Sequence, residues 1–260
     1  HNAKLKTILR SGDATNVYAG GLGDGWAMAE SADFIVNNPP KPASSSVAKG
    51  NPPVAAWDFN EGSGSTTYDE VGSSDGTISG ASWKNENECH TGKCLNYDGT
   101  DDVTTVTQNS DINLTSKAGY TVVAWIRPES DGEADVGQVI YKGASTYLRV
   151  SNESSGTVKI GASFDLDTTD ATFTTTTTIP TLTWSHIALK YDDDSDDEIE
   201  LYINGRYVTA STNGVGSPAT ETNNLLIGGI TTANFKGSID QLAIYNYARS
   251  ASQIKSDYQS

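Results

Sequence analysis

From Val54 to the C-terminus the sequence is a succession of short runs in which apolar and polar residues alternate, separated by turn residues. A period of two runs through residues 121–126 and 184–190 and is typical of β-strands with one buried face. Residues 198–203 and 206–210 flank Asn204-Gly205, a dipeptide that favours a two-residue hairpin turn. About a dozen such runs without a long helix predict an all-β fold of two packed antiparallel sheets.

The ends of the chain differ from this pattern. Residues 3–10 predict a short helix, and residues 12–36 carry glycines with too few apolar side chains for a core of their own. Residues 37–53 hold five of the eight prolines and predict an extended Pro/Ser-rich linker. We therefore divide the chain into an extension (1–36) for assembly or anchoring, a linker (37–53) and a sandwich (54–260). Residues 250–258 predict a short C-terminal helix capped by Ser250 or Ser252.

The charge of the chain limits its partners. The net charge is −16, and it falls on the sandwich, because residues 1–50 hold five basic and four acidic side chains. Such a surface repels nucleic acid and anionic membranes and attracts divalent cations, although an acidic surface without a specific ligand is an equal alternative. No apolar stretch approaches the ~18 residues of a spanning helix, so we expect no membrane span in this chain.

Two cysteines, Cys89 and Cys94, are separated by four residues that include a glycine. This spacing favours a disulfide that closes a tight loop over free thiols, and it lacks the CxxC spacing of zinc and redox sites. A disulfide implies an oxidising compartment, so we expect a secreted or cell-surface protein.

Seven segments, in order, resemble the laminin-G-like (concanavalin A-like) jelly rolls of extracellular proteins. They are residues 54–64 (VAAWDFNEGSG), 68–78 (YD, then DGTI), 92–102 (GKCLNYDGTDD), 120–126 (YTVVAWI), 184–191 (WSHIALKY), 201–205 (LYING) and 235–245 (FKGSIDQLAIY). The resemblance covers residues 54–260 and implies a two-sheet jelly-roll sandwich. The first 50 residues resemble no family.

The resemblance also implies one structural calcium ion, held by carboxylate, amide and carbonyl oxygens. The matching positions here are Asp58, Asn60, Asp98 and Asp240. The alternative is that these side chains accept backbone N–H bonds at strand ends. The acidic run at residues 191–198 lacks EF-hand spacing and predicts a solvated hairpin loop.

Aromatic residues and sequons give weaker signals. Trp57 lies on a strand pattern, and Trp125 and Trp184 alternate in step with apolar neighbours, so we expect the latter two in the core. Trp83 lies in a turn-rich stretch where an exposed ring could stack on a sugar. His186 falls within a strand and has no expected catalytic role. Asn113 and Asn152 begin N-glycosylation sequons.

Glycosidases need two carboxylates a few ångströms apart, and glucanases of this fold carry Glu-x-Asp-x-x-Glu on one strand. The sequence contains no such run, no nucleophile elbow on a strand-to-helix turn, no His-Glu-x-x-His and no P-loop. We therefore expect no enzymatic activity.

Two functions remain. The first is a non-catalytic, calcium-stabilised recognition or adhesion module that binds a glycan or a cell-surface protein. The second is a structural subunit of a surface filament, pilus or layer, in which residues 1–50 self-assemble and the jelly roll forms an outer head.

Overall fold

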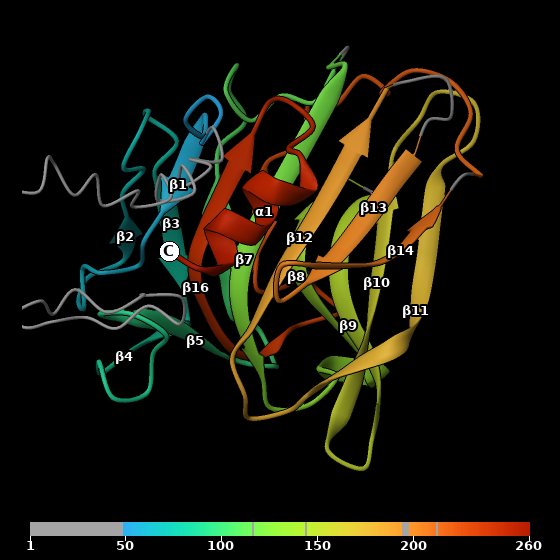
Figure 1. Cartoon of the computed structure of the whole chain (residues 1–260). Helices are drawn as coiled ribbons and strands as arrows, with labels where there is room; N and C mark the ends of the chain where they lie inside the picture. Colours follow the sequence, from blue (N-terminus) through green and yellow to red (C-terminus); the bar gives the residue numbers. More distant parts are fainter. Residues whose placement is uncertain (1–48, 116, 144, 194–197, 212) are drawn as a thin grey trace, which may run out of the picture. The chain divides into compact units, whose positions relative to one another are not determined.

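A computed structural model describes residues 49–260 except 116, 144, 194–197 and 212 (Figure 1). Four predictions fall on residues 1–48 and lie outside the described residues. They are the short helix, the glycine-rich segment, most of the linker and self-assembly through this part of the chain. The centre of the acidic loop, between Asp193 and Glu198, lies outside the described residues as well.

The described chain forms two antiparallel sheets, as the alternating pattern predicts. The first sheet has the order β14 (Arg206–Ser211), β13 (Glu198–Ile203), β12 (Ser185–Asp192), β7 (Gly119–Pro128), β16 (Lys236–Tyr245), β5 (Cys94–Asp98) and β4 (Ser82–Lys84), with β1 (Ala55–Trp57) paired to β16. The second sheet has the order β11 (Ala171–Pro180), β10 (Thr157–Phe164), β9 (Thr146–Ser154), β8 (Val136–Lys142), β15 (Leu225–Ile227), β6 (Val103–Val106), β3 (Gly76–Ser79) and β2 (Thr66–Thr67). A 3₁₀ turn, η1 (Glu133–Asp135), precedes β8.

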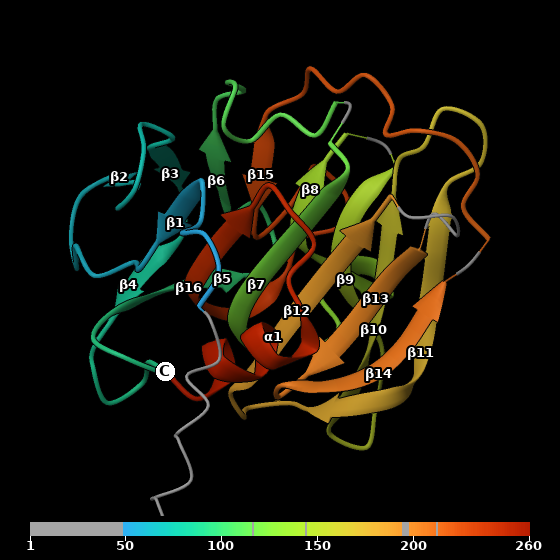
Figure 2. The same ribbon diagram turned by 45° about the horizontal axis from the view of Figure 1, so that its top comes forward.

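Strands that are distant in sequence lie side by side, which is typical of a jelly roll. The last strand, β16, lies between β7 and β5, and β15 lies between β8 and β6 (Figure 2). Hairpins join sequential neighbours such as β12–β13 and β13–β14. In the second of these, Asn204 and Gly205 have φ angles of 50° and 70°, as the turn that we predicted requires.

The core fills the space between the sheets. Its members include inward residues of both sheets, among them Trp57, Tyr97, Phe164 and Ile239, together with Phe59 of the segment after β1. The Trp57 ring is fully buried and its Nε1 donates to the carbonyl of Ser74 at 2.9 Å. Burial of such inward side chains is the main favourable contribution to the stability of the fold.

Two tryptophans expected in this core lie elsewhere. Trp125 is buried on the outer face of the first sheet, where His90 and Tyr258 cover it. Trp184 is half-buried and precedes β12 rather than lying within it. The predictions were wrong because alternation separates the two faces of a strand but does not say which face meets the other sheet.

The helix α1 (Ala251–Tyr258) lies across the outer face of the first sheet (Figures 1 and 2). Ser250 begins it with a capping box, in which Ser250 Oγ accepts the Gln253 N–H and Gln253 accepts the Ser250 N–H. Ile254 anchors the helix in a small apolar cluster on that face. Among the described residues, no helix has the length and apolar character needed to cross a membrane.

Candidate functional site

The predicted disulfide between Cys89 and Cys94 is present, with a Cα–Cα distance of 5.5 Å. It closes a loop that reaches over the outer face of the first sheet. The His90 ring stacks on Trp125 with a centroid distance of 3.6 Å and an interplanar angle of 16°. The disulfide therefore fixes a loop whose side chains and backbone line a buried polar site.

Asp240 is the centre of that site. It is fully buried on β16, and its Oδ2 accepts the backbone N–H groups of His90 at 3.1 Å and Thr91 at 3.0 Å. Its Oδ1 has no hydrogen-bond partner among the described residues. Burial raises the pKa of Asp240 to about 7, and the nearby Asp58 carboxylate adds to this rise. The pKa of Asp58 is raised in turn by partial burial and by Glu61.

The four predicted calcium ligands do not meet at one point. Asn60 lies at the other end of the disulfide loop, where its Oδ1 accepts the Lys93 N–H at 2.8 Å. Asp98 pairs with Lys236, four residues before Asp240 on β16, which corresponds to about 13 Å along the strand. The Asp58–Asp240 pair fits a cation, because a buried carboxylate oxygen without a partner is the kind of group that a cation satisfies.

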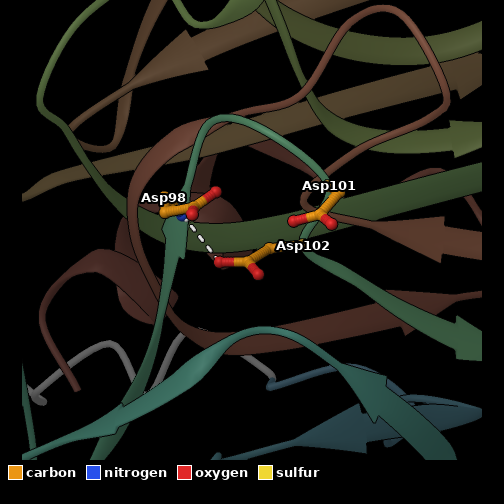
Figure 3. A group of neighbouring side chains, drawn as sticks. All are labelled: Asp98, Asp101 and Asp102. Atoms are coloured by element: carbon orange, nitrogen blue, oxygen red, sulfur yellow. Dashed lines mark hydrogen bonds between the residues drawn. The ribbon is translucent and has the colours of Figure 1, made fainter.

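Asp98 instead belongs to a separate acidic cluster with Asp101 and Asp102, in the turn between β5 and β6 (Figure 3). Carboxylate oxygens of the three side chains lie within 4.8 Å of one another. Asp102 Oδ2 accepts the Asp98 N–H at 2.7 Å and Asp98 Oδ1 accepts the Thr100 N–H at 2.8 Å. These bonds hold the turn between β5 and β6.

A second site, which the sequence analysis missed, lies on the outer face of the second sheet. Tyr141 on β8 and Tyr147 on β9 are direct register partners, and Leu226 on β15 pairs with Tyr141. Their neighbours in the chain, Ile140, Leu148, Leu225 and Ile227, point into the core, so these three side chains point away from it. We call Tyr141, Tyr147, Arg149, Gln138 and Leu226 the tyrosine face.

Two polar atoms of the tyrosine face are buried without a partner. Arg149 and Gln138 are register partners across β9 and β8, next to the tyrosine pair. Arg149 Nε and Gln138 Oε1 have no hydrogen-bond partner among the described residues. Both atoms are shielded from solvent, and burial of a polar group without a bond costs roughly 1–3 kcal/mol.

Two hollows meet at the tyrosine face. One, of about 450 Å³, is lined by Tyr141, Gly143, Asn223, Asn224 and Leu226. The other, of about 360 Å³, lies over β6 and β15 and is lined by Leu226 with Thr100, Asp101, Val103, Thr105, Gly229, Ile230, Thr231 and Asn234. Leu226 is common to both, so the two hollows adjoin at β15. Amide and hydroxyl side chains and the carboxylate of Asp101 are among their lining residues.

The buried amine of Lys142 shapes the first of these hollows. Its Nζ donates to Gln108 Oε1 at 2.5 Å and to the carbonyl of Asn223 at 3.0 Å. Burial lowers the pKa of Lys142 to about 8. The lysine therefore holds the Asn223–Asn224 turn beside Tyr141 and is not itself exposed to a ligand.

The remaining predicted residues lie apart from both sites. Trp83 is half-buried, packs against the core, and its Nε1 donates to the carbonyl of Gly64 at 2.9 Å. Asn152 is exposed at the end of β9, whereas Asn113 is half-buried and its Oδ1 accepts the Thr115 N–H. His186 lies within β12, as expected, and is buried against Trp125.

Comparisons with known proteins agree with this architecture. A structure of domain 4 of AbnA, a GH43 extracellular arabinanase from Geobacillus stearothermophilus, in complex with arabinotriose, is 20% identical with a TM-score of 0.59; the match covers 80% of this chain and 98% of that chain. The binding domain of Paraclostridial Mosquitocidal Protein 1 is 17% identical with a TM-score of 0.63, over 81% of this chain and 52% of that chain. The botulinum neurotoxin serotype D binding domain is 13% identical with a TM-score of 0.59, over 80% of this chain and 51% of that chain.

At these identities the structural likenesses show the fold alone, and this chain spans about half the length of the two toxin binding domains. No curated protein matches the sequence. The sequence profile of the family described as concanavalin A-like lectin/glucanases superfamily matches residues 98–255. Because this match extends over more than half of the chain, and the two-sheet jelly roll agrees with it, the protein belongs to the concanavalin A-like lectin/glucanases superfamily.

Proposed function

We propose that this protein is a non-catalytic carbohydrate-binding module that holds a glycan against the tyrosine face. One observation carries the proposal: the half-exposed pair Tyr141 and Tyr147 lies directly beside the buried, unpartnered Arg149 Nε and Gln138 Oε1. A ligand for this surface needs an apolar face for the rings and polar groups for the half-buried Arg149 side chain beside them. A sugar ring offers C–H groups on its faces and hydroxyls on its edge, and so meets both needs.

The position of these side chains on the sheet supports the proposal. All five residues of the tyrosine face come from β8, β9 and β15, which lie in the middle of the second sheet. Side chains on paired strands lose little further freedom when a ligand binds, so preorganisation lowers the cost of binding. The two hollows that adjoin at Leu226, of about 360 and 450 Å³, give room beside the tyrosines for more than one sugar.

The comparisons add support of a general kind. The superfamily is described as lectins and glucanases, and the AbnA domain was solved with arabinotriose. The bound sugar is a property of the AbnA domain and not of this chain, but it makes a glycan the first class of ligand to test here. Binding of a cell-surface protein through the same face is the outcome that the test must separate from glycan binding.

The residues of the face support the proposal that the module is non-catalytic. The register row that contains the tyrosines consists of Ser163, Tyr147, Tyr141, Leu226 and Thr105. None of these five side chains is a carboxylate, whereas a glycosidase needs two that flank the scissile bond. The disulfide supports an extracellular location for the module.

We further propose that calcium binds at Asp240 and Asp58 and stabilises the sandwich at a distance from the glycan. The support is the unpartnered Asp240 Oδ1 and the proximity of the second carboxylate. The ion would serve the disulfide loop and the first sheet, because the tyrosine face lies on the outer side of the other sheet.

A glycan array followed by titration calorimetry tests the glycan proposal. Tyr141→Ala and Tyr147→Ala should each weaken binding at least tenfold, because each removes an aromatic surface that packs on a sugar. Tyr68→Ala is the matched control, since Tyr68 is 57% exposed and lies outside the tyrosine face. All three variants should unfold at nearly the same urea concentration as the wild type, because outer-face side chains contribute little to the core.

The proposal is wrong if no glycan of the array binds, or if a glycan binds and neither tyrosine variant weakens it. Binding of a protein ligand that depends on both tyrosines, with no glycan bound, would replace glycan recognition by protein recognition.

A further inference from the structure

The guanidinium group of Arg149 has an unusual environment for this protein. It lies over the Tyr147 ring, with its central carbon 4.6 Å from the ring centroid. Its Nε is buried without a hydrogen-bond partner, and the arginine forms no ion pair with any described residue. A half-buried cation without an anion is costly, because desolvation is not balanced by an opposite charge.

The other arginines in the described part of the chain differ from it. Arg127 Nη1 lies 3.7 Å from Glu129 Oε1, and Arg249 Nη2 lies 2.6 Å from Asp257 Oδ1, so both arginines form ion pairs. Arg206 is exposed in the β13–β14 hairpin, where water solvates its charge. With 33 acidic against 17 basic side chains, carboxylates are abundant, yet none of the described ones reaches Arg149.

The local backbone keeps the Arg149 side chain in place. Its register partner on β10 is Gly161, and a Cβ atom built at that glycine would lie 3.0 Å from Arg149 Nε. The glycine thus leaves the space in which the arginine side chain lies. The Tyr147 ring supports one side of the planar group, and Gln138 on β8 lies on the far side of β9 from Gly161.

From this environment we infer that the glycan bound at the tyrosine face carries carboxylate groups, and that Arg149 binds one of them. The inference rests on the proposed function and adds the chemical class of the ligand. A planar guanidinium presents donors in a fork that matches the two oxygens of a carboxylate. The Tyr147 ring, which lies beneath the guanidinium group, then packs against the same sugar.

The charge of the protein narrows the class further. A densely charged polyanion would be repelled by a chain with a net charge of −16, and a single arginine gives one strong contact. The ligand that fits is therefore a glycan of uronic acid type with separated carboxylates, rather than a heavily sulfated one. Ionic strength should weaken the binding with the small slope of one ion pair.

Matched pairs of polysaccharides test the inference. The probes are alginate, polygalacturonate and hyaluronan, each with its carboxyl-reduced counterpart, together with neutral glycans and heparin. We expect at least one uronate probe to bind and to lose tenfold or more in affinity on reduction of its carboxyl groups. Heparin should bind more weakly than that probe.

Arg149→Gln should bind the native and the reduced forms of that probe equally, since the charge that distinguishes them is gone. Arg149→Lys should keep part of the preference, because an ammonium group retains the charge without the fork. Lys159→Gln is the control: Lys159 is a cation on β10 beside Asp131 and Glu153, outside the tyrosine face, and its loss should not change the preference.

The outcomes separate the two proposals. Equal binding of native and reduced forms by the wild type, or binding of neutral glycans only, overturns the inference and leaves the glycan function standing. Heparin as the strongest ligand also overturns it. No binding to any probe overturns both, and a preference for the native form that survives in Arg149→Gln shows that another group recognises the carboxylate.

Discussion

Asp240 and His186 flank the same residue: Asp240 on β16 and His186 on β12 are each the direct register partner of Trp125 on β7. Both are buried on the outer face of the first sheet. Burial raises the pKa of Asp240 to about 7, whereas burial, with a contribution from His90, lowers the pKa of His186 to about 4. Between about pH 4 and 7 both groups are therefore mainly neutral in the folded protein, on either side of one indole ring.

These two shifts should oppose each other in the dependence of stability on pH. Between about pH 4 and 7 native Asp240 keeps a proton that the unfolded chain has released, so its contribution falls as pH rises. Between pH 4 and 6.5 native His186 lacks a proton that the unfolded chain binds, so its contribution rises with pH. As the pH rises from 4 to 6.5, we therefore expect the stability of Asp240→Asn to increase relative to that of the wild type. The stability of His186→Gln should decrease relative to that of the wild type.

Urea unfolding in EDTA at several pH values between 4 and 6.5 measures this prediction. For each variant, the difference in the free energy of unfolding from the wild type should change by about 3 kcal/mol between pH 4 and 6.5. The two differences should change in opposite directions. Asp102, Asp165 and Asp257 have raised pKa values as well, but they are present in all three proteins and cancel in the differences. Asp58 interacts with Asp240, so any change in its titration belongs to the Asp240→Asn difference. If the free energy of unfolding of the two variants depended on pH in the same way, the pKa shifts assigned to Asp240 and His186 would be wrong.

The second prediction concerns calcium. Millimolar calcium should raise the melting temperature of the wild type by roughly 5 °C, and more at pH 8 than at pH 5, because binding requires ionised Asp240. Asp240→Asn should abolish this shift. Asp98→Asn is the matched control, since Asp98 lies in the other acidic cluster. If the shift in melting temperature is lost in Asp98→Asn and retained in Asp240→Asn, the ion binds in the cluster of Asp98. If the wild type shows no shift, calcium does not stabilise this protein.

The sheets could be predicted from the sequence for a simple physical reason. Strands with one buried face alternate with a period of two, and turns such as Asn204-Gly205 mark where the chain reverses. The same pattern could not place Trp125, because the disulfide loop and α1 bury part of the outer face of the first sheet. A tryptophan there has the same neighbours in sequence as one in the core.

The tyrosine face was only partly accessible from the sequence. The paired residues near the ends of β8 and β9 have numbers that sum to 288, so Tyr141 opposite Tyr147 could have been predicted from a tight connection between the two runs. The pairing of Arg149 with Gln138 could not, because an irregularity in register between Gln138 and Ile140 shifts the strand by one residue. Whether a polar atom finds a partner depends on packing, which no local pattern contains.

The third prediction concerns the disulfide. Replacing both cysteines, as in Cys89→Ser with Cys94→Ser, should lower the free energy of unfolding by about 2 kcal/mol, because a cross-link over so short a loop restricts the unfolded chain only modestly. Release of the loop should also change tryptophan fluorescence, since His90 stacks on Trp125.

Glycan affinity serves as the control for this variant, because the tyrosine face lies on the second sheet and should keep its ligand. The chain has two cysteines, so mild reduction of the wild type should reproduce both effects without any substitution. Loss of glycan binding with the sandwich still folded would show that the ligand contacts the disulfide loop instead.

The last prediction concerns Arg249, which ties the beginning of the described chain to its end. Its Nη1 donates to the carbonyl of Lys49 at 3.3 Å and its Nη2 donates to Asp257 Oδ1 at 2.6 Å, while its guanidinium lies 4.0 Å from the centroid of the Tyr245 ring. Arg249→Met should lower the free energy of unfolding by roughly 3 kcal/mol, because it leaves a partly buried carboxylate without its partner. It should also expose residues 49–53 to limited proteolysis before the rest of the sandwich is cut.

Arg206→Met, at an exposed position, is the control and should change the free energy of unfolding by less than about 0.5 kcal/mol. Equal stability of the two variants would mean that stacking on Tyr245, which methionine can replace, holds this end of the chain without help from the ion pair.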